Sequence, residues 1–220
     1  MAKTKQSPTR ESDRIESELR RLILNLELEP GLAVSEAGLM KQYGWGRTPL
    51  REACQRLAEQ ALLQMVPRQG VVIMPLSVFD FVEVMDAMSM VIGTAAALAC
   101  KRLNDEQLEQ LDELVAQGEA AAVAGDHIRV SELDSDFHRV LAEATGNRYL
   151  RDYLVHLQRV ASRFNIATWK RDRDATPSLE EHRQLMELLR QRDVAKAKTA
   201  MLEHIENARQ RVMGSVEYAF

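Results

Sequence analysis

The fold is decided by the stretch YGWGRTPLREA, which occupies residues 43–53. Gly44-Trp45-Gly46 breaks a helical pattern, and Thr48-Pro49 is typical of a helix start, because Thr can cap the backbone and Pro at the first helical position needs no amide partner. The pattern predicts a short helix ending near Tyr43, a tight turn, and a helix over residues 49–60. Two helices joined in this way form a helix-turn-helix.

The flanking segments extend this motif to a winged helix-turn-helix. Apolar residues recur at three- and four-residue spacing over residues 9–28, which predicts an amphipathic helix ended by Pro30-Gly31. Ser35 begins the short helix. Residues 63–66 and 71–74 are short apolar runs separated by a Pro-Arg-Gln-Gly turn, which predicts a β-hairpin as the wing.

From Ser77 onward the pattern is helical only. Capping residues and glycines divide it into six helices that short loops join, which favours an antiparallel bundle. The predicted helices cover about 77–102, 104–125, 126–146 and 148–171, a fifth from 176, and 193–212. The chain is therefore predicted to be mainly α, with a winged helix-turn-helix over residues 1–75 and a six-helix bundle over residues 76–220.

Composition favours a cytoplasmic protein without a membrane partner. Of the 220 residues, 45% are hydrophobic and 28% charged, an ordinary globular balance. The most apolar run, Met85 to Cys100, is interrupted by Asp86 and Ser89, and the basic N-terminus has no apolar segment behind it. The two cysteines are far apart, which argues against a disulfide framework.

The formal net charge of −4 argues against a nucleic-acid partner for the chain as a whole, but the charge is unevenly distributed along it. Residues 1–75 hold 11 Lys+Arg and 9 Asp+Glu, a balance of +2, whereas the remainder holds 18 and 24, a balance of −6. The N-terminal part is weakly basic. We expect it to depend on a few placed arginines and on dimerisation rather than on a large basic surface.

Two arginines are candidates for reading bases. Arg47 and Arg51 are four residues apart at the start of the predicted recognition helix, and the forked guanidinium of Arg matches guanine O6 and N7. Arg68, Gln69 and Gly70 at the hairpin tip suit a wing, where Gly permits close backbone approach. Taken singly, each of these residues is better interpreted as an ordinary solvated surface residue, but together with the turn between two short helices they favour DNA reading.

The N-terminal sequence resembles the DNA-binding domain of the GntR family of bacterial transcription regulators. The RTPxREA core carries the resemblance, with PGxxxSE before it and PRQGV after it. The resemblance implies base contacts by Arg47 and Arg51, a phosphate contact by Thr48, wing contacts by residues 68–70, and dimers on inverted-repeat operators. The family usually has Val-Ser where this chain has Trp45-Gly46, so position 46 is left out of the predicted contacts.

The helical part holds candidate metal ligands. Asp134 and His138 are four residues apart on one predicted helix, and His182 and His204 lie on two later helices. Carboxylate and imidazole together suit zinc, nickel, iron or manganese rather than calcium. Spacing alone leaves open that each histidine is simply a hydrogen-bonded core or surface residue, as it does for His127 and His156.

A second resemblance favours metal ligands over ordinary core or surface histidines. The helical part resembles the FCD ligand-binding domain of the FadR subfamily in four short stretches: DxxFH at 134–138, ATGN at 144–147, EH at 181–182 and MxxHI at 201–205. Members of that subfamily often hold a divalent metal through one Asp and three His. The resemblance implies the metal ligands Asp134, His138, His182 and His204. Six helices favour the VanR-like branch of that subfamily.

The same resemblance implies a small carboxylic acid as effector. A divalent metal with one carboxylate and three neutral imidazoles keeps a net charge of about +1, and octahedral geometry leaves two positions for an anion. The subfamily usually has an Arg where this chain has Met88, and a Glu where it has Ile92. A more apolar acid, or an anchor at Arg159 or Arg163, is therefore expected.

Two other classes of function are weighed against a regulator. A metalloenzyme could use the same three histidines and carboxylate to activate water, but no general base can be named. An architectural DNA protein would show no response to a ligand. We favour the regulator, which is not an enzyme, because the RTPxREA match is the most specific signal.

Overall fold

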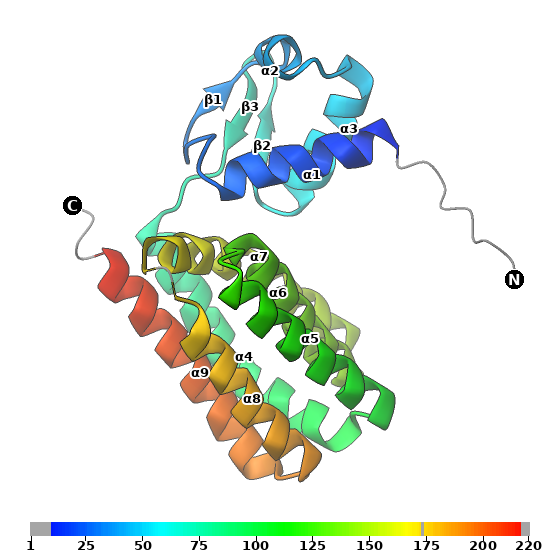
Figure 1. Cartoon of the computed structure of the whole chain (residues 1–220), viewed down its shortest axis with the longest axis vertical. Coiled ribbons are helices and arrows are strands. Elements are labelled where there is room, and N and C mark those ends of the chain that lie inside the picture. The colour runs from blue at the N-terminus through cyan, green and yellow to red at the C-terminus, as the bar shows by residue number, and fades with distance from the viewer. Residues whose placement is uncertain (1–9, 173, 217–220) are drawn as a thin grey trace, which may run out of the picture. The chain divides into compact units, whose positions relative to one another are not determined.

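The computed structural model describes residues 10–172 and 174–216, and the chain divides into two compact units, Met1–Leu76 and Ser77–Phe220. The first unit holds α1–α3 and a small sheet, and the second holds α4–α9 (Figure 1). The division falls one residue after the boundary expected from the sequence. Within the described ranges the fold is the predicted one, a winged helix-turn-helix followed by a six-helix bundle.

The first unit packs three helices on a three-stranded antiparallel sheet. Its elements are α1 (Glu11–Leu24), β1 (Ala33–Val34), α2 (Glu36–Tyr43), α3 (Arg47–Glu59), β2 (Leu63–Val66) and β3 (Gly70–Ile73). The sheet order is β1-β3-β2, so β3 is the central strand. The sequence predicts the β2–β3 hairpin but misses β1, which is only two residues long. The expected start of the first helix, Thr9, lies outside the described residues.

The turn between α2 and α3 depends on two glycines and a buried tryptophan. Gly44 has φ +71° and its amide donates to Met40, so a left-handed residue ends α2. Trp45 is buried and stacks on Tyr43 with ring centroids 4.6 Å apart. Gly46 is the N-cap of α3, which begins at Arg47, two residues earlier than predicted. Thr48 is therefore not the cap, and Arg47 lies inside the first turn.

The wing turns sharply at its tip. The amide of Gln69 donates to the Val66 carbonyl, Pro67 follows Val66, and Arg68 has φ +66°, the arrangement of a type II turn. Gly70 has φ +103°, and a Cβ there would lie 2.5 Å from the Val34 carbonyl oxygen. Only glycine allows β1 and β3 to approach so closely at this position.

The second unit is a helical bundle in which side chains cap the starts of α4, α5 and α6. Its helices are α4 (Val78–Arg102), α5 (Asp105–Val123), α6 (His127–Ala144), α7 (Arg148–Asp172), α8 (Thr176–Arg190) and α9 (Val194–Val216). Ser77 caps α4, Asn104 forms a capping box with Gln107, and Asp126 caps α6. These caps are the ones predicted from the sequence.

Helix α4 is the apolar centre of the bundle. It packs against α6, α7 and α9. Among the described residues it is the one helix that is long and apolar enough, by length and composition, to cross a membrane. Its buried residues belong to the bundle core, and Gly93 allows α9 to approach, since a Cβ there would lie 2.9 Å from Leu202 Cγ. Its central place in the bundle accounts for the 39% of its apolar stretch that is buried.

Replacement of Gly70 tests the wing. We expect Gly70→Ala to lower the free energy of unfolding of the first unit by about 1–3 kcal/mol, because it combines a positive φ with a backbone clash. The loss of stability is measured by urea unfolding, with Trp45 fluorescence as the signal. The Trp169→Phe background is used because Trp45 and Trp169 are the two tryptophans of the chain. Gly31→Ala is the control. Gly31 also has a positive φ, +82°, but a Cβ there would have no neighbouring atom within 4 Å, so the loss of stability should be smaller than for Gly70→Ala. Equal losses in the two variants would contradict the clash.

Candidate nucleic-acid interface and metal centre

A surface cavity on the first unit brings together most of the residues predicted to contact DNA. It lies between the start of α2, the start of α3 and the wing. Its lining residues are Ser35, Glu36, Ala37, Arg47, Arg51, Met65, Val66, Pro67, Arg68, Gln69 and Gly70. Thr48 is exposed on α3 but does not line it. Five of the six predicted DNA contacts therefore surround one concave surface.

Arg51 is held by an acidic neighbour that sequence reasoning did not single out. Its Nε donates to both carboxylate oxygens of Glu36, each at 3.0 Å. Its side chain is still 62% exposed, so the edge formed by the terminal nitrogens remains available. Glu36 is recognisable from the sequence as the first residue of α2. Its pairing with Arg51 is not, because the two residues are 15 positions apart and meet only in the tertiary fold.

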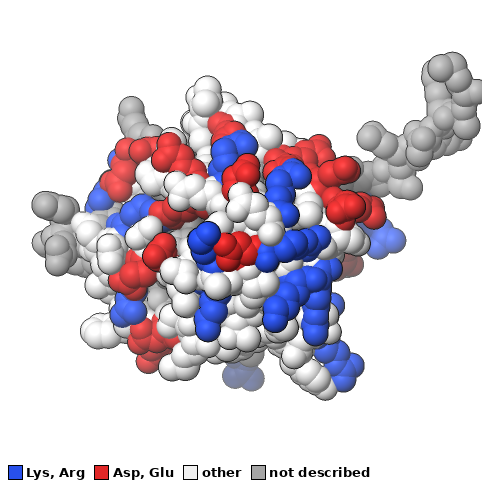
Figure 2. All heavy atoms as spheres, turned by 90° about the horizontal axis from the view of Figure 1, so that it is seen from below, with Lys and Arg blue, Asp and Glu red and all other residues white. Residues whose placement is uncertain are grey.

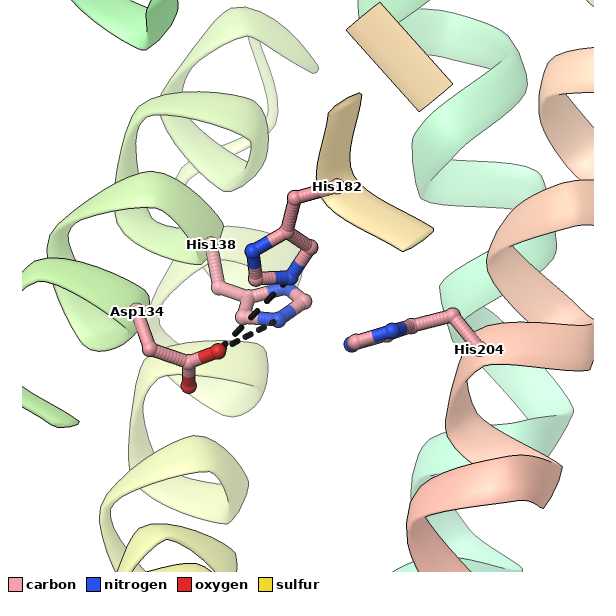
Figure 3. A group of neighbouring side chains, drawn as sticks. All are labelled: Asp134, His138, His182 and His204. Atoms are coloured by element: carbon pink, nitrogen blue, oxygen red, sulfur yellow. Dashed lines mark ion pairs between the residues drawn. The ribbon is translucent and has the colours of Figure 1, made fainter. Parts of the chain in front are cut away.

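In the second unit, one aspartate and three histidines converge on a common point (Figure 3). Asp134 and His138 come from adjacent turns of α6, His182 from α8 and His204 from α9. One ligand atom from each residue lies within 4.8 Å of the others, and the four residues are only 1–8% exposed. His127 and His156 are not part of the cluster.

Burial sets the protonation of this cluster. It lowers the pKa of His138 to about 3, and it lowers the pKa of His182 well below the ordinary value. Burial also raises the pKa of Asp134 to about 6, although the charge of His204 and a hydrogen bond from Gln158 act in the opposite direction. His138 and His182 are therefore neutral at physiological pH, which is the form that binds metal.

The cluster fits a divalent transition metal. The Nε2 atom of His182 is buried without a hydrogen-bond partner and lies 3.6 Å from Asp134 Oδ1. A buried polar atom left without a partner is costly, and a cation between these groups removes that cost. Three imidazole nitrogens and one carboxylate suit zinc, nickel, manganese or iron. Asp134 would be oriented by Gln158, whose amide donates to Oδ2 at 2.7 Å.

A cavity of about 220 Å³ lies beside the cluster. Its lining residues are Met88, Ile92, Ser135, Asp136, His138, Arg139, Leu154, Val155, Gln158 and Arg159, from α4, α6 and α7. The predicted effector residues Met88 and Arg159 are among them, but Arg163 is not. Burial lowers the pKa of Arg163 to about 10, partly offset by Asp80, so Arg163 is a buried residue elsewhere on α7.

The two arginines of this cavity differ in their partners. Arg139 is engaged by Asp136 and Glu143, with both ion pairs at 3.0 Å. Arg159 makes no ion pair with any residue in the described part of the chain. The face shown in Figure 2 carries both acidic and basic side chains, with several basic side chains grouped on one side. Arg159 is therefore the cation of this cavity that an added anion can reach.

Comparison with known proteins identifies a family for each of the two units. The family model of the bacterial regulatory proteins of the gntR family matches residues 11–73, and the FCD domain model matches residues 83–207. A transcriptional regulator from an unstable DNA locus of Streptomyces ambofaciens is 30% identical over 197 residues, 85% of this chain and 78% of that protein. These matches are to regulators and not to enzymes.

Two further similarities extend over most of the chain. The transcriptional repressor RspR of Escherichia coli K12 is 24% identical over 188 residues, 86% of this chain and 82% of that protein. The solved structure of E. coli McbR/YncC superposes with a TM-score of 0.74 at 19% identity, covering 94% of this chain and 99% of that one. At that identity the structural match shows the fold alone.

Metal binding tests the cluster. After chelator treatment, the protein should take up about one zinc or manganese ion per chain, with a rise in melting temperature, because a ligand that binds the folded state stabilises it. His182→Ala and His204→Ala should abolish uptake, as measured by elemental analysis and calorimetry. His156→Ala, an exposed histidine outside the cluster, is the control and should bind like the unmodified protein. Retained uptake in the cluster variants would contradict the assignment.

Proposed function

Because the chain belongs to the GntR family of bacterial regulatory proteins and carries an FCD domain, we propose that it binds an inverted-repeat operator as a homodimer and responds to a small organic acid. The effector binds beside a divalent metal held by Asp134, His138, His182 and His204. A regulator of operator DNA acts in the bacterial cytoplasm. The single observation that carries this proposal is the buried Asp-His₃ cluster next to a cavity with an available arginine.

The DNA-reading role rests on the grouping of side chains around one cavity. Arg47 and Arg51 present guanidinium groups from the first turns of α3, and the wing tip presents Arg68 and Gln69. In a helix-turn-helix the start of the second helix faces base edges in the major groove, and a wing contacts the adjacent backbone. A two-fold dimer repeats these contacts on two half-sites, which accounts for an inverted repeat.

The effector role rests on charge and shape. A divalent metal with one carboxylate and three neutral imidazoles carries about +1, which attracts an acid group. Met88, Ile92 and Leu154 give the cavity an apolar wall, and Arg159 supplies a second cation at its edge. A carboxylate with a compact apolar body satisfies these groups better than a fully polar diacid, which would bury a charge against the apolar wall. The six helices of the second unit are consistent with the VanR-like branch.

Regulation then follows from linkage. If the acid and the operator favour different arrangements of the dimer, binding of one changes the affinity for the other by the same factor. No chemical change in the acid is needed. Recovery of the acid unaltered after it has shifted operator affinity distinguishes this mechanism from metal-dependent hydrolysis.

Replacement of the recognition arginines tests the DNA-reading role. We expect Arg47→Ala or Arg51→Ala to cost about 1–3 kcal/mol in operator binding and to relax base preference at one position in each half-site. Fluorescence anisotropy measures the affinity, on an operator selected by the unmodified protein from random duplexes. Arg14→Ala, an arginine of α1 paired with Glu18, is the control. Unchanged affinity in both recognition variants would refute the assignment.

A thermal-shift series tests the effector role. Metal-loaded protein should gain about 2.7 kcal/mol of stability at a hundredfold excess over Kd, and monocarboxylic acids with an apolar body should act at lower concentration than dicarboxylic acids. Arg159→Gln should weaken the response because it removes the free cation of the cavity. Arg148→Gln, on the same helix outside the cavity, should not. An equal response in the two variants would exclude Arg159 as an anchor.

A further inference from the structure

Glu181 forms a dense set of hydrogen bonds beside the metal cluster. The Nδ1 atom of His204 lies 2.7 Å from Glu181 Oε2. Arg211 donates to both carboxylate oxygens, at 2.7 and 3.0 Å, and the amide of Asn207 donates to Oε1 at 3.0 Å. Four contacts from three residues of α9 therefore meet on one side chain of α8.

This contact fixes which nitrogen of His204 faces the cluster. A carboxylate only accepts hydrogen bonds, so Nδ1 carries the proton, and in the neutral imidazole Nε2 is then left with a free electron pair. The far edge of the His204 ring is directed at the other three cluster residues (Figure 3). We propose that Glu181 is a positioning residue for the metal centre, which holds His204 in the tautomer and orientation that bind the metal through Nε2.

The inference rests on the proposed metal site but goes beyond its four ligands. A carboxylate that accepts from the second nitrogen of a metal-binding imidazole orients the ring and makes it a stronger donor. Glu181 also immediately precedes His182 in α8. Two consecutive residues of α8 thus act on the same cluster: His182 is one of its four members, and Glu181 contacts His204 of α9.

Arg211 and Asn207 keep Glu181 in this supporting role. Without them, a carboxylate so close to the cluster could turn toward a cation and become a fifth ligand. Both oxygens of Glu181 are instead occupied by donors. Arg211 also offsets the carboxylate charge, so that the centre keeps the net positive charge that an anionic effector needs.

The alternative is that Glu181 only pins α8 to α9 as an ion pair. The two roles differ in what they do to His204. A purely structural pair changes stability when it is broken, whereas a positioning residue also changes the imidazole tautomer and the metal affinity of a protein that is still folded.

The test compares Glu181→Gln with Glu180→Gln. Both remove one negative charge from adjacent positions of α8, but Glu180 is exposed and makes no contact of this kind in the described chain. In metal-free protein, long-range ¹H–¹⁵N spectra should show His204 protonated at Nδ1 in the unmodified chain and in Glu180→Gln, and a mixture of tautomers in Glu181→Gln. Zinc affinity, measured by competition with a chelator, should fall about 10–100-fold in Glu181→Gln alone.

The outcomes separate this inference from the metal site itself. If the unmodified protein binds no zinc or manganese, the proposed metal site fails, whatever the variant does. If the unmodified protein binds zinc and Glu181→Gln retains both the affinity and the His204 tautomer, the positioning role is overturned while the metal site stands. Circular dichroism of each variant without metal establishes that the bundle is folded, and Glu181→Asp, which keeps the charge but shortens the reach, should recover part of the affinity if the fold is retained.

Discussion

The second unit depends on the burial of four polar side chains at one point. Asp134, His138, His182 and His204 come from three helices and are almost completely removed from water. Polar groups buried without partners are costly, so α6, α8 and α9 must meet in a register that lets these groups satisfy one another or share a cation. The cluster thus constrains how these three helices pack against one another.

Much of this structure could be predicted from the sequence, because local signals and long-range packing agree. Ser77, Asn104 and Asp126 cap the helices they were expected to cap, and capping residues together with glycines located all six helices of the bundle. The turn around Gly44 was also found. The start of α3 was misplaced by two residues because Thr48-Pro49 is a strong local signal for a helix start, whereas the N-cap in the structure is Gly46.

The parts that sequence reasoning missed involve partners far apart in the chain. Strand β1 is two residues long and exists only because β3 pairs with it. Glu36 and Glu181 carry ordinary helix-surface signals, and their contacts with Arg51 and His204 arise from the tertiary fold. Arg163 was named as an effector anchor from its position on an expected helix, but periodicity cannot say which cavity a face adjoins. The resemblance to FCD domains therefore implied the four metal ligands, but it did not indicate Glu36 or Glu181, which contact site residues through the tertiary fold.

The pairing of Arg51 with Glu36 bears on how the protein searches DNA. An arginine whose charge is already balanced attracts the phosphate backbone weakly, so it contributes little to binding at random sequence. Its terminal nitrogens are still able to match a guanine edge once the helix is seated in the groove. If Arg51 reads a base as proposed, the same ion pair weakens binding to random DNA more than binding to the operator, and a short stay at each wrong site would let the protein scan many sites quickly.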